Sequence, residues 1–237
     1  MIRRILLPCA AAILAAAGLW YAAAGRNRTT YFLLEGTSLE TEVCEIRGKD
    51  EGLAVYVVAG IHGDETAGIL AAERLKRSRI ERGTLYILST ANGYGAENDQ
   101  RKTEEERDLN RNFPGDPEGW DAERIAAAIY GDIEEKQPAV VLDLHEARAA
   151  EVGKDALGDS LICQSLDGTG DMVLELLMQT AFTLYGSPPS GSINRTVTDE
   201  LGIPVITVET FRGDEMEVRI EKHLEVTDFV LTYCGLS

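Results

Sequence analysis

A short apolar run in the first half of the chain ends abruptly at a glycine, and this run constrains the fold more than any other stretch. Residues 53–59 are rich in β-branched side chains, which predicts a buried strand. From residue 66 to residue 77 the apolar spacing becomes helical, so the polar residues in between form a strand-to-helix turn. Because ligands in open α/β sheets bind beyond the carboxyl ends of strands, the stretch predicts a sheet with a binding site at that edge.

Two possible metal ligands lie in this turn. His62 and Glu65 are three residues apart, and Gly60 and Gly63 permit the sharp backbone path that turns both side chains toward one point. Imidazole nitrogen and carboxylate oxygen are ordinary zinc ligands. A lone His-x-x-Glu pattern is more often a surface turn, so the interpretation depends on partners elsewhere in the chain.

Two later apolar runs also end in side chains of this kind. Residues 139–144 lead into His145, and residues 203–208 end at Glu209. A carboxylate at the end of a buried strand is costly to desolvate unless it meets a cation. Two histidines and one carboxylate with an open fourth position form a common catalytic zinc arrangement, so the three strand ends favour a zinc hydrolase. The alternative is a metal-free structural domain in which the histidines are core residues.

The remaining histidine and the cysteines give no second site. His223 lies in a charged helical pattern over residues 214–231, and we expect an ordinary surface residue there. Beyond the N-terminal segment, the cysteines are Cys44, Cys163 and Cys234. They are widely separated, so we expect small buried residues and neither a disulfide framework nor a cysteine zinc site.

The order of the predicted elements indicates the fold class. Strands alternate with helices, which predicts a three-layer α/β domain whose mixed, mostly parallel sheet has helices on both faces. Polar, glycine-containing stretches predict long surface loops over residues 92–106 and 186–194. Further strands are predicted over residues 31–34, 42–47, 85–89 and 160–163, and helices over residues 122–136, 172–185 and 196–201. The first two strands should form an edge of the sheet.

The chain begins with a segment that differs from the rest. Two arginines near the start precede an uncharged apolar stretch over residues 5–25, which is typical of an export signal. The stretch is also long enough to stay in the membrane as an anchor. We therefore expect a signal peptide or N-terminal membrane anchor over residues 1–26. Residues 27–237 would then form an extracytoplasmic catalytic domain, either secreted or anchored.

The charge of the chain argues against one class of partner. The sequence has 40 acidic side chains against 23 lysines and arginines, which gives a formal net charge of -17. Nucleic acids and anionic membrane surfaces repel such a chain. We therefore expect no nucleic-acid partner, and membrane contact only through the N-terminal segment.

Four stretches of the chain resemble the motifs of one protein superfamily, in the superfamily's order. They are residues 60–65 (GIHGDE), 108–114 (DLNRNFP), 143–145 (DLH) and 202–209 (GIPVITVE). On these motifs the sequence resembles the zinc carboxypeptidase superfamily, which includes the M14 peptidases and the succinylglutamate desuccinylase and aspartoacylase group. The resemblance spans most of the domain and implies the zinc carboxypeptidase-like α/β fold.

The resemblance also implies roles for the residues at the strand ends. It implies that His62, Glu65 and His145 hold one Zn²⁺ per chain, and that Glu209 is the catalytic base. Arg101 is placed as the arginine that polarises the scissile carbonyl, with Arg107 as its rival.

A second set of residues would bind the substrate. The resemblance implies that Asn110 and Arg111 grip a free carboxylate, which suits the planar guanidinium group. Ser192, Ile193 and Asn194 look like the stretch that lines the pocket for the terminal side chain. Tyr185 is the nearest candidate for the aromatic residue that the superfamily carries on a mobile loop, although it is displaced toward the preceding helix.

Together these features predict a zinc-dependent hydrolase that cleaves an amide bond next to a free carboxylate. We expect first a carboxypeptidase-like action on small peptides. The close alternative is a deacylase that acts on an N-acyl amino acid with a free carboxylate. From another class, the alternative is a non-catalytic domain that binds peptide ends.

Overall fold

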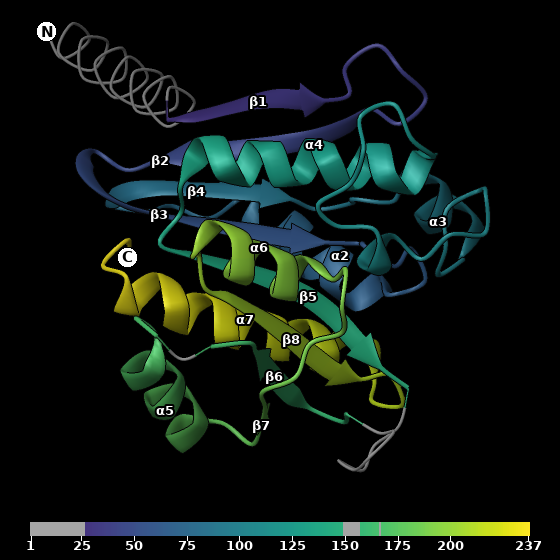
Figure 1. Cartoon of the computed structure of the whole chain (residues 1–237). Coiled ribbons are helices and arrows are strands. Elements are labelled where there is room, and N and C mark those ends of the chain that lie inside the picture. Colours follow the sequence, from purple (N-terminus) through teal and green to yellow (C-terminus); the bar gives the residue numbers. More distant parts are fainter. Residues whose placement is uncertain (1–26, 149–156, 166) are drawn as a thin grey trace, which may run out of the picture.

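The protein is built around one mixed β-sheet (Figure 1). The computed structural model describes residues 27–148, 157–165 and 167–237. Within these residues, eight strands form one sheet in the order β1-β2-β4-β3-β5-β8-β6-β7. The strands are β1 (Arg28–Leu33), β2 (Thr41–Arg47), β3 (Asp50–Ala59), β4 (Arg82–Leu88), β5 (Val140–Ala147), β6 (Ser160–Cys163), β7 (Thr183–Tyr185) and β8 (Val205–Phe211).

The centre of the sheet is parallel, as the alternation of strands and helices predicts. Strand β3 pairs in parallel with β4 and with β5, and β5 pairs in parallel with β8. Antiparallel pairs occur toward the edges, between β1 and β2, between β2 and β4, and between β6 and β8. In the pairing of β5 with β8, His145 stands directly beside Glu209. The carboxyl ends of β3, β5 and β8 therefore meet at one edge of the sheet.

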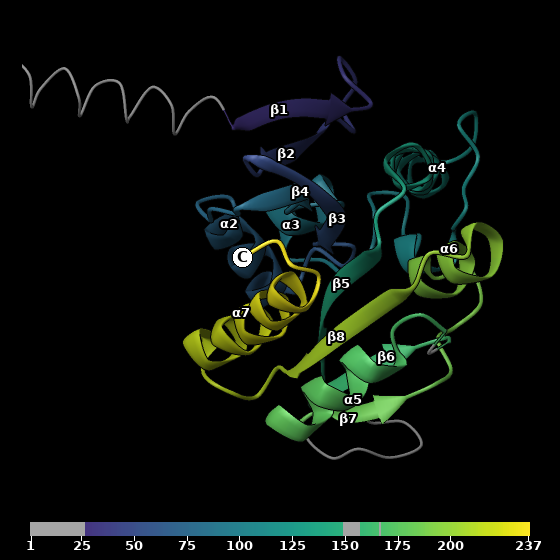
Figure 2. The ribbon, with the colours of Figure 1, turned by 90° about the vertical axis from the view of Figure 1, so that its left-hand side faces the viewer.

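Helices cover both faces of this sheet, which gives the predicted three layers (Figure 2). Helices α2 (Thr66–Leu75), α5 (Gly170–Gln179) and α7 (Met216–Tyr233) pack on one face, and α4 (Asp121–Lys136) and α6 (Ile193–Leu201) pack on the other. Side chains of β3 alternate between the two cores, because Val55 and Val57 face the first and Tyr56 and Val58 face the second. Burial on both faces explains why a central parallel strand is an unbroken apolar run. Two shorter helical elements are α3 (Gly93–Asn98) and the 3₁₀ turn η1 (Leu109–Arg111).

Two predicted segments differ from the observed elements. The helix predicted over residues 172–185 ends at Gln179, and its last three residues form strand β7 instead. Residues 183–185 pair with β6, so sheet pairing overrides the local apolar spacing. The loop predicted over residues 92–106 contains helix α3, whose amino end is capped by the Asn92 side chain accepting from the Gly95 N–H.

The prediction that His223 lies at the surface is wrong. His223 is fully buried on the face of α7 that packs against the sheet, where its Nε2 lies 3.2 Å from the Thr210 hydroxyl. Burial lowers the pKa of His223 from 6.5 to about 3, because the charged imidazolium would lose its hydration. The cysteine prediction is confirmed in part, since Cys44 and Cys163 are buried and free while Cys234 is half-buried.

The N-terminal signal or anchor expected over residues 1–26 lies outside the described residues. Within the described part of the chain, none of the helices combines the length and the apolar character needed to cross a membrane.

The buried His223 gives the fold a specific acid sensitivity. The unfolded chain binds a proton at His223 near pH 6.5, whereas the folded chain does so only near pH 3. Stability is therefore lost as the pH falls below the unfolded value. Between about pH 7.5 and about pH 5.5, the wild type should lose about 1 kcal/mol more unfolding free energy than His223→Gln. Urea denaturation of both proteins at each pH measures the difference, and an equal loss in both would show that His223 is not buried neutral.

Candidate metal centre

The turn after β3 has the sharp path that the sequence predicts, for two different reasons. Gly60 adopts a left-handed φ of +66°. At Gly63 the constraint is space, since a Cβ there would lie 2.0 Å from the carbonyl carbon of Gly95. Only glycine allows this close approach of the turn to α3, and Glu65, two residues further on, directly precedes α2.

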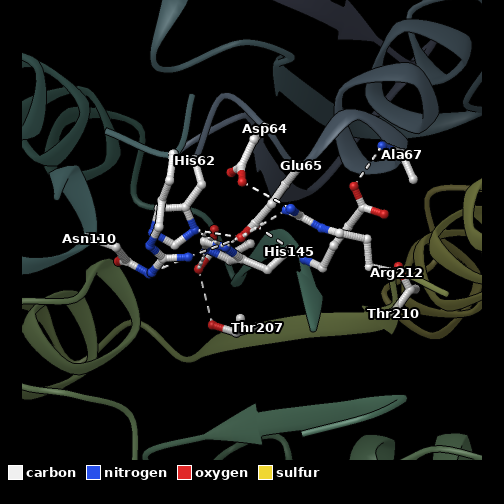
Figure 3. Close-up of polar contacts among 12 residues, drawn as sticks. His62, Asp64, Glu65, Ala67, Asn110, His145, Thr207, Thr210 and Arg212 are labelled. Carbon is white, nitrogen blue, oxygen red and sulfur yellow. Dashed lines mark hydrogen bonds and ion pairs between the residues drawn. The ribbon is translucent and has the colours of Figure 1, made fainter. Parts of the chain in front are cut away.

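Three side chains from this turn and from β5 converge on one point (Figure 3). His62 Nδ1 lies 2.8 Å from Glu65 Oε1, and His145 Nδ1 lies 2.6 Å from Glu65 Oε2. The two Nδ1 atoms are 3.0 Å apart. One ligand atom from each residue falls within 4.8 Å of the others. The structure therefore brings together the three predicted metal ligands, although they come from positions up to 83 residues apart.

The electrostatics of this cluster require a positive charge. Glu65 is only 2% exposed. Burial alone would raise the pKa of the Glu65 carboxyl, but the two imidazoles hold it well below its usual value. Likewise, burial opposes protonation of His145, but Asp143 and Glu65 raise its pKa well above the ordinary value. A cation bound among these donors would compensate the buried negative charge of Glu65 and would take the place of the proton on His145. A His₂Glu donor set with room beside it fits zinc.

Two further carboxylates hold the imidazoles from behind. Asp108 Oδ1 lies 3.1 Å from His62 Nε2, and Asp143 Oδ2 lies 2.9 Å from His145 Nε2. Each contact leaves the Nδ1 atom of its ring for the metal and fixes the ring orientation. Burial raises the pKa of Asp108, but the hydrogen bond to His62 and the charges of His62, Arg101 and Arg111 together lower it below its usual value. The sequence motifs alone indicate neither role. The period-two spacing of Asp143 and His145 on one strand face was the available signal for the second.

A buried charge network fixes the turn against α7. The Glu146 carboxylate pairs with Arg219 and accepts from the Ala67 N–H at 3.1 Å, while the Glu146 N–H donates to Glu65 Oε2 at 3.2 Å. This network ties the metal-ligand carboxylate to the start of α2 (Figure 3). Local sequence patterns gave no sign of it, because Glu146 and Arg219 are 73 residues apart.

A second arginine supports the same turn. Arg212, just beyond the end of β8, donates to Asp64 Oδ2 at 2.9 Å. Its Nη2 lies 3.9 Å from Glu65 Oε1. Burial opposes the charge of Arg212, but the hydrogen bond with Asp64 raises its pKa.

A cavity of about 210 Å³ opens beside the metal ligands. Its volume is below the roughly 300–1,000 Å³ typical of pockets for drug-sized ligands. Besides the three metal ligands it is lined by Arg101, Asn110, Arg111, Glu146, Ala147, Arg148, Leu157, Ile162, Pro188, Pro189, Ser192, Asn194, Thr207 and Glu209. Most of the predicted site residues thus face one small cavity.

The two candidate arginines of the loop between α3 and η1 take different positions. Arg101 lines the cavity, with Nη1 at 3.3 Å from Glu65 Oε1 and Nη2 at 3.2 Å from Asp108 Oδ2. Arg107 instead lies over the ring of Trp120, with its guanidinium carbon 4.6 Å from the ring centre. Among the described residues, only Arg101 of the two lines the cavity.

The predicted substrate-binding residues differ in their position relative to the cavity. Arg111 lines the cavity, and the hydrogen bond of its side chain runs to the Asn110 carbonyl at 2.7 Å. Ser192 and Asn194 also line the cavity, but Ile193 is fully buried, and its N–H donates to Asn110 Oδ1 at 3.0 Å.

Tyr185 is the remaining predicted substrate-binding residue. It ends strand β7 and is not among the described residues that line the cavity, so its role in substrate binding stays a prediction.

Glu209 completes the wall of the cavity from inside the buried strand β8, two residues before the strand ends. It is 8% exposed, and it neighbours His145 in the sheet. Burial raises the pKa of its carboxyl to about 7. A carboxyl with such a pKa exchanges protons near neutral pH, which is the property of a general acid and base.

Comparison with known proteins identifies one family. The succinylglutamate desuccinylase/aspartoacylase catalytic domain matches residues 51–226. A curated relative, an N-alpha-acetyl-L-2,4-diaminobutyric acid deacetylase of Halomonas elongata, is 36% identical over 101 residues. That alignment covers 41% of this chain and only 29% of the relative.

Solved structures show the same fold. An aspartoacylase family protein of Mesorhizobium loti matches 89% of this chain and 68% of its own, with 21% identity and a TM-score of 0.70. A cell shape determinant protein of Helicobacter pylori, solved with a tripeptide bound, matches 83% of this chain and 56% of its own. That pair has 15% identity and a TM-score of 0.71. At these identities the likeness concerns the fold.

The cluster predicts the metal content of the protein. The wild type should bind about one zinc per chain, and His145→Ala should lose it, because the buried carboxylate keeps only one imidazole partner. Elemental analysis after gel filtration measures the content. His223→Gln is the matched control, since it changes the histidine that lies outside the cluster, and it should retain zinc. A zinc-free wild type after zinc has been supplied would refute the site.

The carboxylates behind the imidazoles predict a smaller effect. Asp108→Asn and Asp143→Asn should each weaken zinc affinity by about 10- to 100-fold, because the rings lose a partner that orients them and raises their basicity. Competition with a chelating dye measures the affinity. Asp121→Asn, a change at the start of α4, is the control and should leave the affinity unchanged. Unchanged affinity in both test variants would show that these contacts are incidental.

Proposed function

The chain belongs to the succinylglutamate desuccinylase/aspartoacylase family, and from this premise we propose that it is a zinc-dependent hydrolase that removes the acyl group from a small N-acyl amino acid. One observation carries the proposal. The cavity combines a His₂Glu metal centre, a buried carboxylate at Glu209 and the guanidinium of Arg111. These are the parts that hydrolysis of an amide next to a carboxylate requires.

The size of the cavity and the curated relative support an N-acyl amino acid over a longer peptide. A cavity of about 210 Å³ suits a substrate of amino-acid size. The relative from Halomonas elongata acts, by its name, on an N-acetyl amino acid. The deacylase alternative of the sequence analysis is therefore the better supported one.

Arg111 and Asn110 would orient the substrate. Arg111 would bind the free carboxylate with its guanidinium, because its side chain hydrogen-bonds only a backbone carbonyl among the described partners. Asn110 accepts from the Ile193 N–H at its Oδ1, which turns its Nδ2 toward the metal ligands, 3.3 Å from His145 Nε2, where it would also donate to the substrate. Binding at this end places the amide bond over the metal ligands.

Glu209 and Arg101 would take part in the chemical step. A bound zinc ion supplies Lewis acidity, which polarises the carbonyl and makes water acidic enough to lose a proton near neutral pH. Glu209 would accept the proton of the attacking water and return it to the departing amine. Arg101 would stabilise the negative charge that develops on the carbonyl oxygen, from its position beside Glu65 and Asp108.

A second candidate is the carboxypeptidase-like action on small peptides that the sequence analysis placed first. The structural likeness to the Helicobacter pylori protein with a bound tripeptide favours it. The same centre, base and carboxylate-binding arginine would serve both reactions. Assays of peptides against N-acyl amino acids separate the two.

The location of the protein stays a proposal as well. We propose that it acts outside the cytoplasm, because the apolar stretch behind two arginines at the start of the chain has the composition of an export segment.

The proposed base predicts the behaviour of one variant. Glu209→Gln should retain zinc and lose about 100-fold or more in kcat, because the amide cannot accept the proton of water. Steady-state hydrolysis of N-acetyl amino acids, with elemental analysis of the same preparation, measures both quantities. Normal turnover by the zinc-loaded variant would remove Glu209 from the mechanism.

The proposed contact between Arg111 and the substrate carboxylate predicts a loss of affinity that is selective for carboxylate substrates. Arg111→Ala should raise KM for N-acyl amino acids by about 10-fold or more, because a charge-assisted contact worth about 1.5–3 kcal/mol is removed. The corresponding amidated substrates lack the charge, so their kinetics should change little. An equal rise in KM for the N-acyl amino acids and for their amidated forms would show that Arg111 does not bind the carboxylate.

A further inference from the structure

One wall of the cavity contains a buried hydrogen-bond acceptor without a partner. Asn194, on the first turn of α6, lines the cavity and is 1% exposed. Its Nδ2 donates to the Ile162 carbonyl at 2.8 Å and to the Thr207 hydroxyl at 2.9 Å. A carbonyl oxygen can only accept, so the amide orientation is fixed. Its Oδ1 atom has no partner among the described residues.

The contacts behind Asn194 make this oxygen a better acceptor. The Thr207 hydroxyl donates to Asp143 Oδ2 at 3.1 Å, and the same carboxylate oxygen lies 2.9 Å from Nε2 of the metal ligand His145. Each donor in this series points toward the buried carboxylate. Successive hydrogen bonds polarise one another, so electron density is pushed toward Asn194 Oδ1.

The rest of this wall cannot satisfy the oxygen. Its neighbours along the cavity include Ile162, Pro188 and Pro189, whose side chains have no donor. The Ser192 hydroxyl is already used, because it donates to the Pro189 carbonyl at 2.7 Å and accepts from the Arg195 N–H at 3.2 Å. A buried acceptor left without a partner is costly, and a ligand that supplies the donor removes that cost.

We propose that Asn194 selects substrates whose amino-acid side chain ends in a hydrogen-bond donor, such as an amine, and disfavours carboxylate side chains. This inference rests on the proposed deacylase function, with the substrate carboxylate at Arg111. The proposal places the side chain of the bound amino acid along the wall to which Asn194 contributes. An ammonium group completes the Asn194 acceptor, whereas a carboxylate meets a second acceptor with a buried carboxylate behind it.

The rival reading is that Arg148 recruits an acidic side chain. Arg148 also lines the cavity, but its side chain is 69% exposed and pairs with Asp64 at 3.2 Å. An exposed, already paired arginine contributes less to binding than a buried acceptor that lacks a partner. The two readings predict opposite substrate orders.

Three N-acetyl amino acids of similar size test the inference on the zinc-loaded enzyme. N-acetyl-L-2,4-diaminobutyrate carries a terminal amine, N-acetyl-L-norvaline a methyl group in its place, and N-acetyl-L-aspartate a carboxylate. We expect kcat/KM for the amine to exceed that for each of the others by about 10-fold or more. Similar values for all three, or a preference for aspartate, would overturn the inference and leave the deacylase proposal standing.

Binding of the product amino acids gives a measurement that does not depend on the acyl group. Calorimetry with L-2,4-diaminobutyrate, L-norvaline and L-aspartate should show the same order and a preference of about 10-fold or more for the amine. Equal binding of the three would overturn the side-chain inference alone. Neither hydrolysis nor binding of any of them would overturn both the inference and the proposed function.

The Asn194→Leu variant assigns the preference to this residue. It removes the acceptor, so the ratio between the amine and the methyl substrate should fall to near one. Asn98→Leu, the same change at an exposed position of α3, is the matched control and should keep the wild-type ratio. Thermal unfolding shows whether Asn194→Leu is folded, and the wild-type ratios decide the inference if it is not. A folded Asn194→Leu with the wild-type ratio would refute the assignment.

Discussion

The structure depends on one buried carboxylate. Glu65 is almost fully removed from water between the imidazoles of His62 and His145. An uncompensated charge in such a place costs several kcal/mol, so the fold is arranged to supply positive charge there. The outer nitrogens of the rings meet Asp108 and Asp143. Carboxylate, imidazole and carboxylate therefore alternate around a point that accepts a cation, and the position of every ligand is fixed from two sides.

The parallel sheet is what brings these groups together. Strands β3, β5 and β8 run in the same direction, so the residues that follow their apolar cores share one edge. The register that places His145 beside Glu209 also places Asp143 beside Thr207. A metal ligand is thereby linked, through two hydrogen bonds beyond its carboxylate partner, to Asn194 in the wall of the cavity. The metal centre and the surface that would contact the substrate side chain belong to one connected network.

The sequence predicted the central strands because burial on both sheet faces makes them visible as unbroken apolar runs. The strands β5 and β8 run on to Ala147 and Phe211, so His145 and Glu209 lie inside them and not just beyond their ends. It failed at His223 because the charged residues of α7 dominate the local pattern. The buried positions of that helix include Ile220, His223, Val226 and Val230, at helical spacing, so the signal was present but was read as a charged surface. The error over residues 172–185 has another cause, since pairing with β6 decides that the last residues form a strand.

The sequence by itself determined the α/β fold, the three metal ligands, the catalytic candidate Glu209 and the family to which the chain belongs. Local periodicity and short motifs indicate these properties, and both depend on residues that are close together in the chain. Only the tertiary structure decided that Arg101 rather than Arg107 lines the cavity, and that one oxygen of Asn194 is left without a partner. Such facts depend on how distant segments pack, because a side chain's hydrogen-bond partners are set by the elements that fold against it.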